Sequence, residues 1–161
     1  MNSLIIFGAK YLFVFVVLIY LLAWAQASKK YKIQMAVTLI LAGIVAIILD
    51  KVGSKVYYDP RPFVTHNVKP LVTHIADNGF PSEHTVFTAS LSMALFFFRP
   101  KMGIASFVLA VLVGCSRVAA HIHSPIDIVG GLLIGIIAGA AGYYLCPQVM
   151  RLWKPKLHGE P

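Results

Sequence analysis

The sequence has few charged residues, and acidic residues are the scarcest of them. Only 12% of the 161 residues are Asp, Glu, Lys or Arg, whereas a soluble domain carries about 25%. Hydrophobic residues make up 58% of the chain. This composition leaves too few polar residues to cover a solvated surface, so it excludes an ordinary soluble domain. We expect an integral membrane protein with a single domain over residues 1–161.

Cysteine is also scarce, with two residues in the chain. Cys115 and Cys146 lie in or beside apolar segments and show no recognisable metal-binding spacing, so we interpret both as packing residues. The net charge of +8 is not accompanied by a basic stripe or an aromatic-interleaved motif, and we predict no nucleic-acid partner. In a membrane protein, an excess of Lys and Arg is typical of cytoplasmic loops.

Apolar segments separated by polar connections predict the fold. A transmembrane helix needs about 20 apolar residues, and the first, second and fifth segments reach this length. The third is short, so its polar first turn should lie near the membrane interface. The pattern predicts an all-α polytopic bundle of about five spans. The segments cover residues 4–24, 34–52, 84–98, 102–119 and 125–146.

Basic residues predict how the bundle is oriented. The connections at 25–33 and 99–101 and the tail after 146 should share one side, with the 53–82 connection opposite. The first side holds Lys29, Lys30, Lys32, Arg99, Lys101, Arg151, Lys154 and Lys156, and the second holds Lys51, Lys55, Arg61, Lys69 and Arg117. Because Lys and Arg are enriched in cytoplasmic loops, we place the first side in the cytoplasm. The long 53–82 loop then faces outward.

Three short polar motifs fall on this outer side, at residues 61–62, 81–84 and 116–127. Ionisable groups at a membrane boundary are costly, which makes them candidates for function. In the third motif, Ser124 and Asp127 are typical of a helix start. His123 lies four residues before Asp127, so the carboxylate can accept a proton from one imidazole nitrogen and leave the other free to attack. The alternative is that Asp127 only caps the helix.

The second motif repeats this design. Ser82 can cap the helix that follows, whose N–H groups and dipole favour an anion. His84 in the first turn could protonate a leaving oxygen, or could simply bond water at the interface. Arg61 and Arg117 suit bidentate contacts to phosphate; the alternative is that they extend toward lipid headgroups.

Two rival interpretations use the same residues. A zinc site could draw on side chains that are acceptable ligands: Glu83, His84, His121, His123 and Asp127. Two guanidinium groups nearby would repel a dication, so we predict no metal and no cofactor. A non-enzymatic lipid or proton pathway could use the His and Asp residues as a relay. A relay, however, needs neither paired Arg residues nor a helix-terminal Ser.

The motifs resemble the signature of the type 2 phosphatidic acid phosphatase superfamily, which are membrane-embedded lipid phosphatases. Its third motif is Ser-Arg, five residues, His, three residues and Asp. That motif is matched in full by Ser116, Arg117, His123 and Asp127. The second motif, Pro-Ser-Gly-His, is matched except that Glu83 replaces the Gly.

The first motif of this family is Lys, six residues and Arg-Pro. Arg61 and Pro62 are present, but Lys55 lies five residues before the Arg, and Ser54 occupies the expected position. The resemblance covers about residues 50–145. It implies a vanadium-chloroperoxidase-like phosphatase core, usually with six spans, of which one N-terminal helix is missing here.

The resemblance also implies a mechanism. His123 would attack phosphorus, Asp127 would orient it, and His84 would protonate the leaving group. The phosphate oxygens would be held, without a metal, by Arg61, Arg117 and Ser82.

An acid followed by His in the second motif is similar to the undecaprenyl pyrophosphate phosphatase branch. The resemblance therefore implies removal of the terminal phosphate of a polyprenyl pyrophosphate at the outer face of a bacterial inner membrane, which recycles the cell-wall lipid carrier. A sister phosphatase acting on phosphatidylglycerol phosphate, a lipid A phosphate or diacylglycerol pyrophosphate is the alternative. Glu83 could pair with an Arg, meet a protonated phosphate or turn away.

Overall fold

The computed structural model describes residues 2–153, which are helical apart from their connections. Lys154 and Lys156, two of the residues used to predict orientation, lie outside the described residues. The helices are α1 (Asn2–Ala25), α2 (Lys29–Val56), α3 (Pro62–Thr65), α4 (Glu83–Phe96), α5 (Pro100–Ala119) and α6 (Pro125–Trp153). The predicted all-α fold is confirmed, and two helices precede Arg61.

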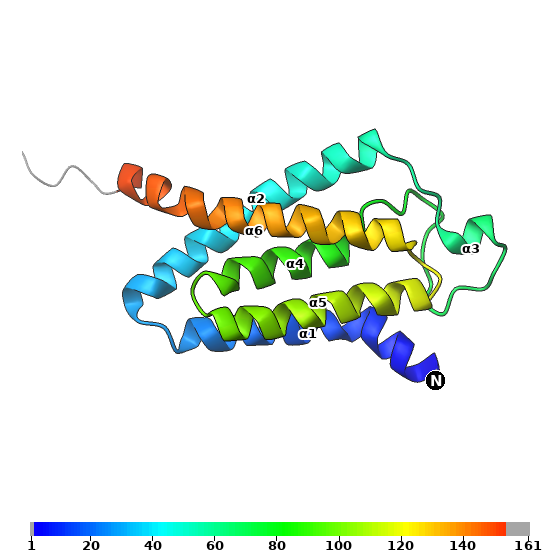
Figure 1. Ribbon diagram of the computed structural model, residues 1–161, viewed down its shortest axis with the longest axis horizontal. Helices are drawn as coiled ribbons and strands as arrows, with labels where there is room; N and C mark the ends of the chain where they lie inside the picture. The colour runs from blue at the N-terminus through cyan, green and yellow to red at the C-terminus, as the bar shows by residue number, and fades with distance from the viewer. Residues whose placement is uncertain (1, 154–161) are drawn as a thin grey trace, which may run out of the picture.

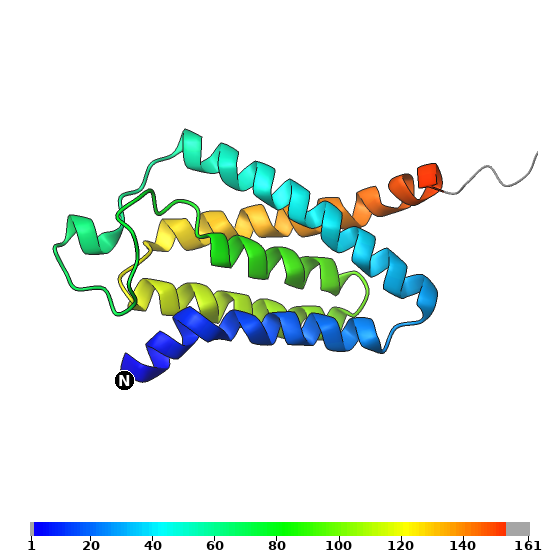
Figure 2. The same ribbon diagram turned by 180° about the vertical axis from the view of Figure 1, so that it is seen from behind.

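The long helices lie side by side, and their connections gather at two ends of the bundle (Figure 1). One end carries the α1–α2 and α4–α5 connections together with the end of α6. The other carries the start of α1, the long α2–α4 connection with α3, and the α5–α6 connection, as the view from behind also shows (Figure 2). This is the division into two sides that the sequence predicts, and it brings all three motifs to one end.

Helix α4 is the central element, packed against α1, α2, α5 and α6. It has 14 residues and rises about 21 Å at 1.5 Å per residue, less than the roughly 30 Å of a bilayer core. Its buried hydroxyl groups bond within the protein, as when Ser92 Oγ donates to the Thr88 carbonyl at 2.7 Å. Among the described residues, the other four long helices are long and apolar enough to cross a membrane. The short third segment is therefore a helix enclosed by the spans.

Glycines on α6 allow it to pack closely on α4. Gly131, Gly135 and Gly139 recur at four-residue spacing along one face. A Cβ added at Gly135 would lie 2.5 Å from the Ala89 Cβ on α4, a distance that no side chain can occupy. Small residues at this spacing are typical of close helix packing in lipid, and they hold the N-termini of α4 and α6 next to each other.

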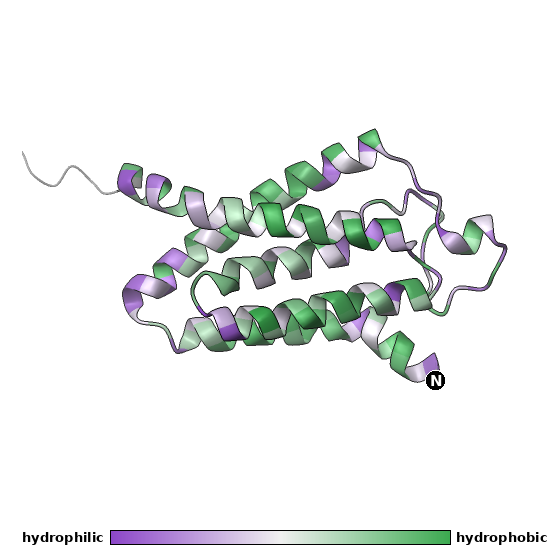
Figure 3. Ribbon diagram, in the orientation of Figure 1, coloured by the Kyte–Doolittle hydropathy of each residue, from purple (hydrophilic) through white to green (hydrophobic). Residues whose placement is uncertain are grey.

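The helices are composed of apolar residues along most of their length (Figure 3). Large side chains such as Leu18, Ile40 and Ile104 are more than half exposed. A continuous apolar surface of this kind is stable only in contact with lipid. At the end opposite the motifs, the rings of Phe97 and Tyr143 stack with centroids 4.3 Å apart, and aromatic residues are typical of a membrane interface. The chain is a multi-pass membrane protein.

Candidate active site

The three polar motifs meet in one cavity at the end of the bundle that carries the α2–α4 connection. The cavity has a volume of about 390 Å³. Of the site residues that the sequence predicts, the cavity is lined by Arg61, Glu83, His84, Arg117 and His123. With residues of α2 included, the lining comes from α2, α4, α5 and both connections at this end, and residues far apart in the sequence share one space.

His123 and Asp127 form a buried pair at the start of α6. His123 Nδ1 lies 3.1 Å from Asp127 Oδ2, and the same oxygen accepts the Ser124 N–H at 2.9 Å. Asp127 thus makes both contacts considered from the sequence, capping the helix and orienting the imidazole. The α2–α4 connection passes close to this carboxylate at Gly79. A Cβ at that position would lie 2.7 Å from Asp127 Oδ2, so a residue with a side chain would crowd the carboxylate.

The second nitrogen of His123 faces two guanidinium groups. Its Nε2 lies 3.3 Å from Arg61 Nη1 and 3.1 Å from Arg117 Nη2. A guanidinium has donors and no acceptor, so Nε2 accepts and carries no proton. The proton of the neutral ring is then on Nδ1, where it is donated to Asp127. This tautomer leaves a lone pair on Nε2 in the part of the cavity that attracts anions.

Arg61 is buried and held by several partners. Its Nε donates to Asp77 Oδ1 at 2.6 Å, and its Nη1 donates to the Ile122 carbonyl at 2.8 Å. Its Nη2 donates to the Asn78 carbonyl at 3.4 Å. Because each of the three guanidinium nitrogens donates one of these hydrogen bonds, the group is held in one orientation, with Nη1 toward His123. This arrangement is the opposite of an arginine that extends toward lipid headgroups.

Arg117, near the end of α5, is also buried. Its Nη1 donates to the Ala9 carbonyl of α1 at 3.2 Å, and its Nη2 faces His123 and His74. Its Nε has no hydrogen-bond partner within the described residues. Ser116, the neighbouring residue of the same motif, instead donates to the Leu112 carbonyl.

The second motif is divided between the cavity and the protein interior. Glu83 and His84 line the cavity, and the His84 ring meets Phe13 edge-on with centroids 5.5 Å apart. Ser82 precedes α4, but its hydroxyl makes no capping hydrogen bond and is absent from the cavity lining. It accepts the Thr85 Oγ1 hydrogen bond at 3.0 Å instead. Ser82 is thus the N-cap residue of α4, as predicted, but without a capping hydrogen bond from its hydroxyl, and its contact with phosphate stays a prediction.

Lys55, the lysine predicted from the first motif, also lies outside the cavity lining. Lys55 is exposed and does not line the cavity, whereas Lys51 and Ser54 do. Successive helix residues are rotated by about 100°, so the step from Ser54 to Lys55 turns the side chain off the cavity face. Lys51 is nearly one turn before Ser54 and returns to that face. The cavity thus has a lysine from α2, at a position that the motif spacing does not indicate.

Burial and charge control the protonation of the central histidine. Burial lowers the pKa of His123 below its ordinary value of 6.5, and the positive charges of Arg117 and Arg61 act in the same direction. The hydrogen bond and charge of Asp127 oppose this shift without reversing it. His123 is therefore neutral at pH 7, which is the form that can act as a nucleophile.

The α2–α4 connection supplies functional residues that the sequence analysis missed. Asn78 accepts N–H groups from Asp59 and Phe80 and donates to the carbonyls of Ser54 and Tyr57, which joins this connection to the end of α2. Asp59 in turn accepts the hydroxyl hydrogen bond of Ser124.

His74 and Asp77 in the same connection line the cavity. The only sequence signal for these residues is that the loop is long.

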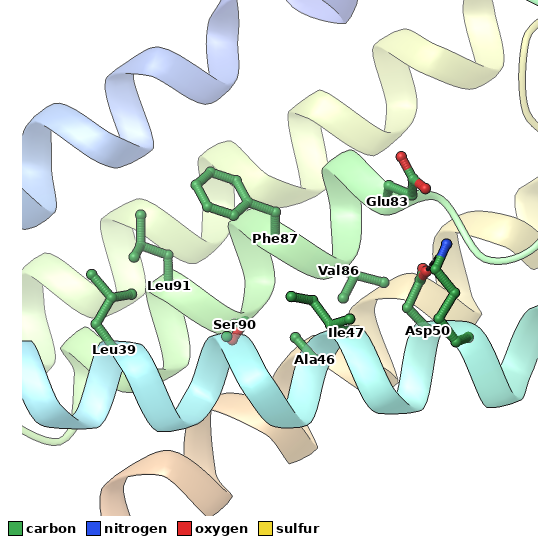
Figure 4. Close-up of a pocket in the computed structure, with 11 residues that line it drawn as sticks. Leu39, Ala46, Ile47, Asp50, Glu83, Val86, Phe87, Ser90 and Leu91 are labelled. Atoms are coloured by element: carbon green, nitrogen blue, oxygen red, sulfur yellow. Dashed lines mark ion pairs between the residues drawn. The ribbon is translucent and has the colours of Figure 1, made fainter.

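A second cavity, also of about 390 Å³, lies between α2 and α4. Its lining is mainly apolar side chains such as Leu39, Ile47 and Phe87, and Asp50 and Glu83 lie together at its outer end (Figure 4). The two cavities share Asp50, Lys51 and Glu83, so the apolar groove begins where the charged cavity stops.

The side chains proposed as zinc ligands are not arranged as a metal-binding group. Within residues 2–153 no three His, Cys, Asp or Glu side chains are grouped so that they could hold a metal ion. His121 is exposed and is not part of the cavity lining.

A buried imidazole that faces two guanidinium groups, at one end of membrane-spanning helices, is an arrangement suited to binding a phosphate group. Residues 31–151 match the PAP2 superfamily, and the chain belongs to this family. The family resemblance seen in the motifs is thereby confirmed.

Among curated proteins, the undecaprenyl-diphosphatase BcrC of Bacillus subtilis is 34% identical over 86% of this chain and 72% of its own length. The bacitracin transport permease protein BcrC of Bacillus licheniformis is 32% identical over 92% and 73%. The putative undecaprenyl-diphosphatase YbjG of Escherichia coli is 31% identical over 98% and 76%.

Two solved structures share the fold. LpxE of Aquifex aeolicus superposes with a TM-score of 0.62 at 23% identity, covering 88% of this chain and 93% of its own. A transmembrane PAP2-type phosphatidylglycerolphosphate phosphatase of Bacillus subtilis gives a TM-score of 0.61 at 23% identity, covering 96% and 79%.

Proposed function

We propose that this protein removes the terminal phosphate of a polyprenyl diphosphate, of the undecaprenyl class, through a phosphohistidine intermediate. The names of the curated relatives BcrC and YbjG support the substrate class. The observation that carries the chemistry is the unprotonated His123 Nε2, which faces Arg61 and Arg117 while Nδ1 is bound to Asp127.

The proposed first step is attack of the His123 Nε2 lone pair on the terminal phosphorus. A phosphorus–nitrogen bond forms, and the bond from phosphorus to the bridging oxygen breaks. The lipid monophosphate leaves with a proton from His84, which takes up that proton from solvent when the anionic substrate binds. Asp127 stabilises the positive charge that develops on the imidazole. The guanidinium groups of Arg61 and Arg117 stabilise the negative charge on the phosphoryl oxygens.

The proposed second step is hydrolysis of the phosphohistidine. A water molecule attacks phosphorus from the side that the lipid monophosphate has left, and His84, having given up its proton, accepts one from this water. The phosphorus–nitrogen bond breaks, inorganic phosphate is released, and His123 returns to its starting state. Each step uses positive charge from side chains of the chain itself, so we propose that no metal is required.

The apolar groove between α2 and α4 supports a substrate with a long hydrocarbon tail. A lipid diphosphate has a charged end and an apolar end, and the two adjoining cavities have the same division. The terminal phosphate would lie at His123, and the first isoprene units would lie along Ile47 and Phe87. The linking phosphate would then lie beside Lys51 and Glu83, two of the three residues shared by both cavities.

A panel of substrates tests this proposal. Purified protein in detergent should hydrolyse undecaprenyl diphosphate with a higher kcat/KM than phosphatidylglycerol phosphate, a lipid A phosphate or diacylglycerol pyrophosphate. A preference for one of these other lipids would support the sister-phosphatase alternative, which the titles of the two structural neighbours also suggest. Absence of phosphate release from every lipid would support the non-enzymatic pathway.

We further propose that the active site faces the outside of a bacterial cytoplasmic membrane. The basic residues at the opposite end, such as Lys30 and Arg99, support this orientation. Two exposed lysines, one at each end of the bundle, allow a matched test in a background that lacks Cys115 and Cys146. In intact cells, Lys69→Cys should react with a membrane-impermeant thiol reagent. Lys30→Cys should not react. The reverse labelling would place the site in the cytoplasm.

A further inference from the structure

His74 is a third histidine in the charged cavity, and neither the family motifs nor the proposed steps give it a role. It lies in the α2–α4 connection, and its ring centroid is 6.1 Å from that of His123, with the two rings nearly perpendicular. Its Nε2 lies 3.5 Å from Arg117 Nη2. The same Arg117 nitrogen is 3.1 Å from His123 Nε2, so one guanidinium nitrogen joins the two imidazoles.

The contact with Arg117 determines the tautomer of His74. Because a guanidinium can only donate, Nε2 of His74 is an acceptor and its proton lies on Nδ1. That Nδ1 is buried and makes no well-formed hydrogen bond within the described residues, although the Ile75 backbone lies close to the ring. A buried donor without a well-formed hydrogen bond is unfavourable. The position of the His74 ring therefore satisfies its own hydrogen-bonding groups poorly, while it points Nε2 at Arg117 inside the cavity.

A phosphate that binds in front of His123 would compete for the Arg117 hydrogen bonds. Phosphate oxygens are strong acceptors, and their contacts with Arg are charge-assisted. His74 Nε2 would then lose its donor and face a phosphate oxygen, with one lone pair opposite another. This repulsion is removed if Nε2 takes up a proton from solvent, because the imidazolium then donates to the oxygen.

We propose that His74 is a third phosphate-binding side chain, which is protonated at Nε2 when phosphate binds and donates to a terminal phosphate oxygen beside Arg61 and Arg117. This inference rests on the proposed function only in that the cavity binds phosphate. It adds a residue from the α2–α4 connection to the site, and it couples phosphate binding to proton uptake.

The charged groups around His74 fit this role. Burial lowers the pKa of His74, and the charges of Arg61 and Arg117 act in the same direction. A hydrogen-bonding contact with the Ile75 backbone and the charge of Asp77 oppose this lowering. His123 and His84 are further titratable groups close to the ring. Since Asp77 is already paired with Arg61 at 2.6 Å, His74 is neutral at pH 7 until a bound anion supplies the missing negative charge.

Inhibition by inorganic phosphate tests the inference against a matched control. Purified His74→Gln protein should bind phosphate about tenfold more weakly than wild type. It should also lose the part of the pH dependence of Ki that arises from proton uptake. The control variant His66→Gln alters an exposed histidine of the same connection and should match wild type at every pH. Titration of phosphate itself is common to all three proteins and cancels in the comparison.

A second variant separates charge from folding. His74→Lys keeps a cation, so it should bind phosphate more tightly than His74→Gln and should show no pH dependence from this position. Equal Ki values and equal pH profiles for wild type and His74→Gln would overturn the inference and leave the phosphate site intact. Equal weakness of the Gln and Lys variants would also overturn it, because charge would then be irrelevant. Failure of phosphate to inhibit wild type would overturn the phosphate site itself.

Discussion

The charged cavity and the apolar groove have the same volume, about 390 Å³ each, and they share Asp50, Lys51 and Glu83. They differ in how the chain builds them. Helix ends and connections line the charged cavity, where backbone groups such as the Ile122 carbonyl fix the arginines. The sides of α2 and α4 line the groove, where backbone groups are already bonded within the helices and only side chains are presented.

This difference shows how one small bundle can hold both parts of an amphiphile. Polar side chains in the charged cavity are costly to bury, and Arg61, the buried arginine of the α2–α4 connection, is fixed by several long-range hydrogen bonds. The groove needs only apolar side chains at helical spacing, together with a small residue such as Gly43 that leaves room. Substitutions in the two cavities should therefore affect different quantities, turnover in the first and recognition of the tail in the second.

The largest effect is expected from His123→Ala, which removes the attacking nitrogen from the charged cavity. Turnover should fall on the order of 10⁴-fold or more, while the thermal unfolding profile in detergent stays close to that of wild type. His121→Ala, which changes an exposed histidine two residues earlier, is the control and should keep its activity. Detection of a phosphorylated His84 in place of His123 would refute the assignment.

The next largest effect is expected from Asp127→Asn. The amide keeps the shape and one acceptor for the Ser124 N–H, but it cannot stabilise an imidazolium by charge. We expect kcat to fall by roughly 10²–10⁴-fold. If steady-state kinetics show nearly wild-type kcat, Asp127 acts only as a helix cap.

A change in the groove should separate tail recognition from chemistry. A Cβ at Gly43 has no neighbour within 4 Å, so Gly43→Leu would place its side chain in the groove. We expect KM for a long-chain polyprenyl diphosphate to rise about tenfold, with little change for a short, water-soluble prenyl diphosphate. Ile44→Leu, at an adjacent position exposed on the outer surface, is the control. Equal loss with both substrates would mean that the tail does not lie between α2 and α4.

A smaller effect is expected at the junction of the two cavities. Lys51→Ala should lower kcat/KM for the diphosphate by roughly three- to tenfold, because in the proposed binding mode its cation, which is largely exposed, lies near the linking phosphate. Lys55→Ala should stay within about twofold, since that side chain does not line either cavity. A larger loss of kcat/KM for Lys55→Ala than for Lys51→Ala would mean that the family motif identifies the phosphate-binding lysine better than the geometry of α2 does.

The smallest effect is expected from chelation. Phosphate release should be unchanged in EDTA, because Arg61, Arg117 and the helix N-termini near His123 supply the positive field. Activity would be measured before and after dialysis against the chelator. Loss of activity that zinc alone restores would show that the cavity depends on a metal.

Local patterns in the sequence predicted part of the site well. His123 and Asp127 are four residues apart at a helix start, so their contact depends on one helical turn and could be foreseen. Lys55 shows the limit of spacing alone, because an offset of one residue on α2 turns a side chain off the cavity face. His74 and Asn78 were missed because their roles depend on contacts with residues far away in the sequence.

The sequence by itself determined the membrane character, the helical fold, the sidedness of the connections and the His123–Asp127 pair. These features follow from composition, from periodicity and from interactions within about one helical turn. Only the tertiary structure decided which cations face His123, since Arg61 Nη1 is held by the Ile122 carbonyl 61 residues away and Arg117 Nη1 by the Ala9 carbonyl 108 residues away. The tertiary structure also placed an apolar groove beside the charged cavity, because the groove exists only where two separate helices meet.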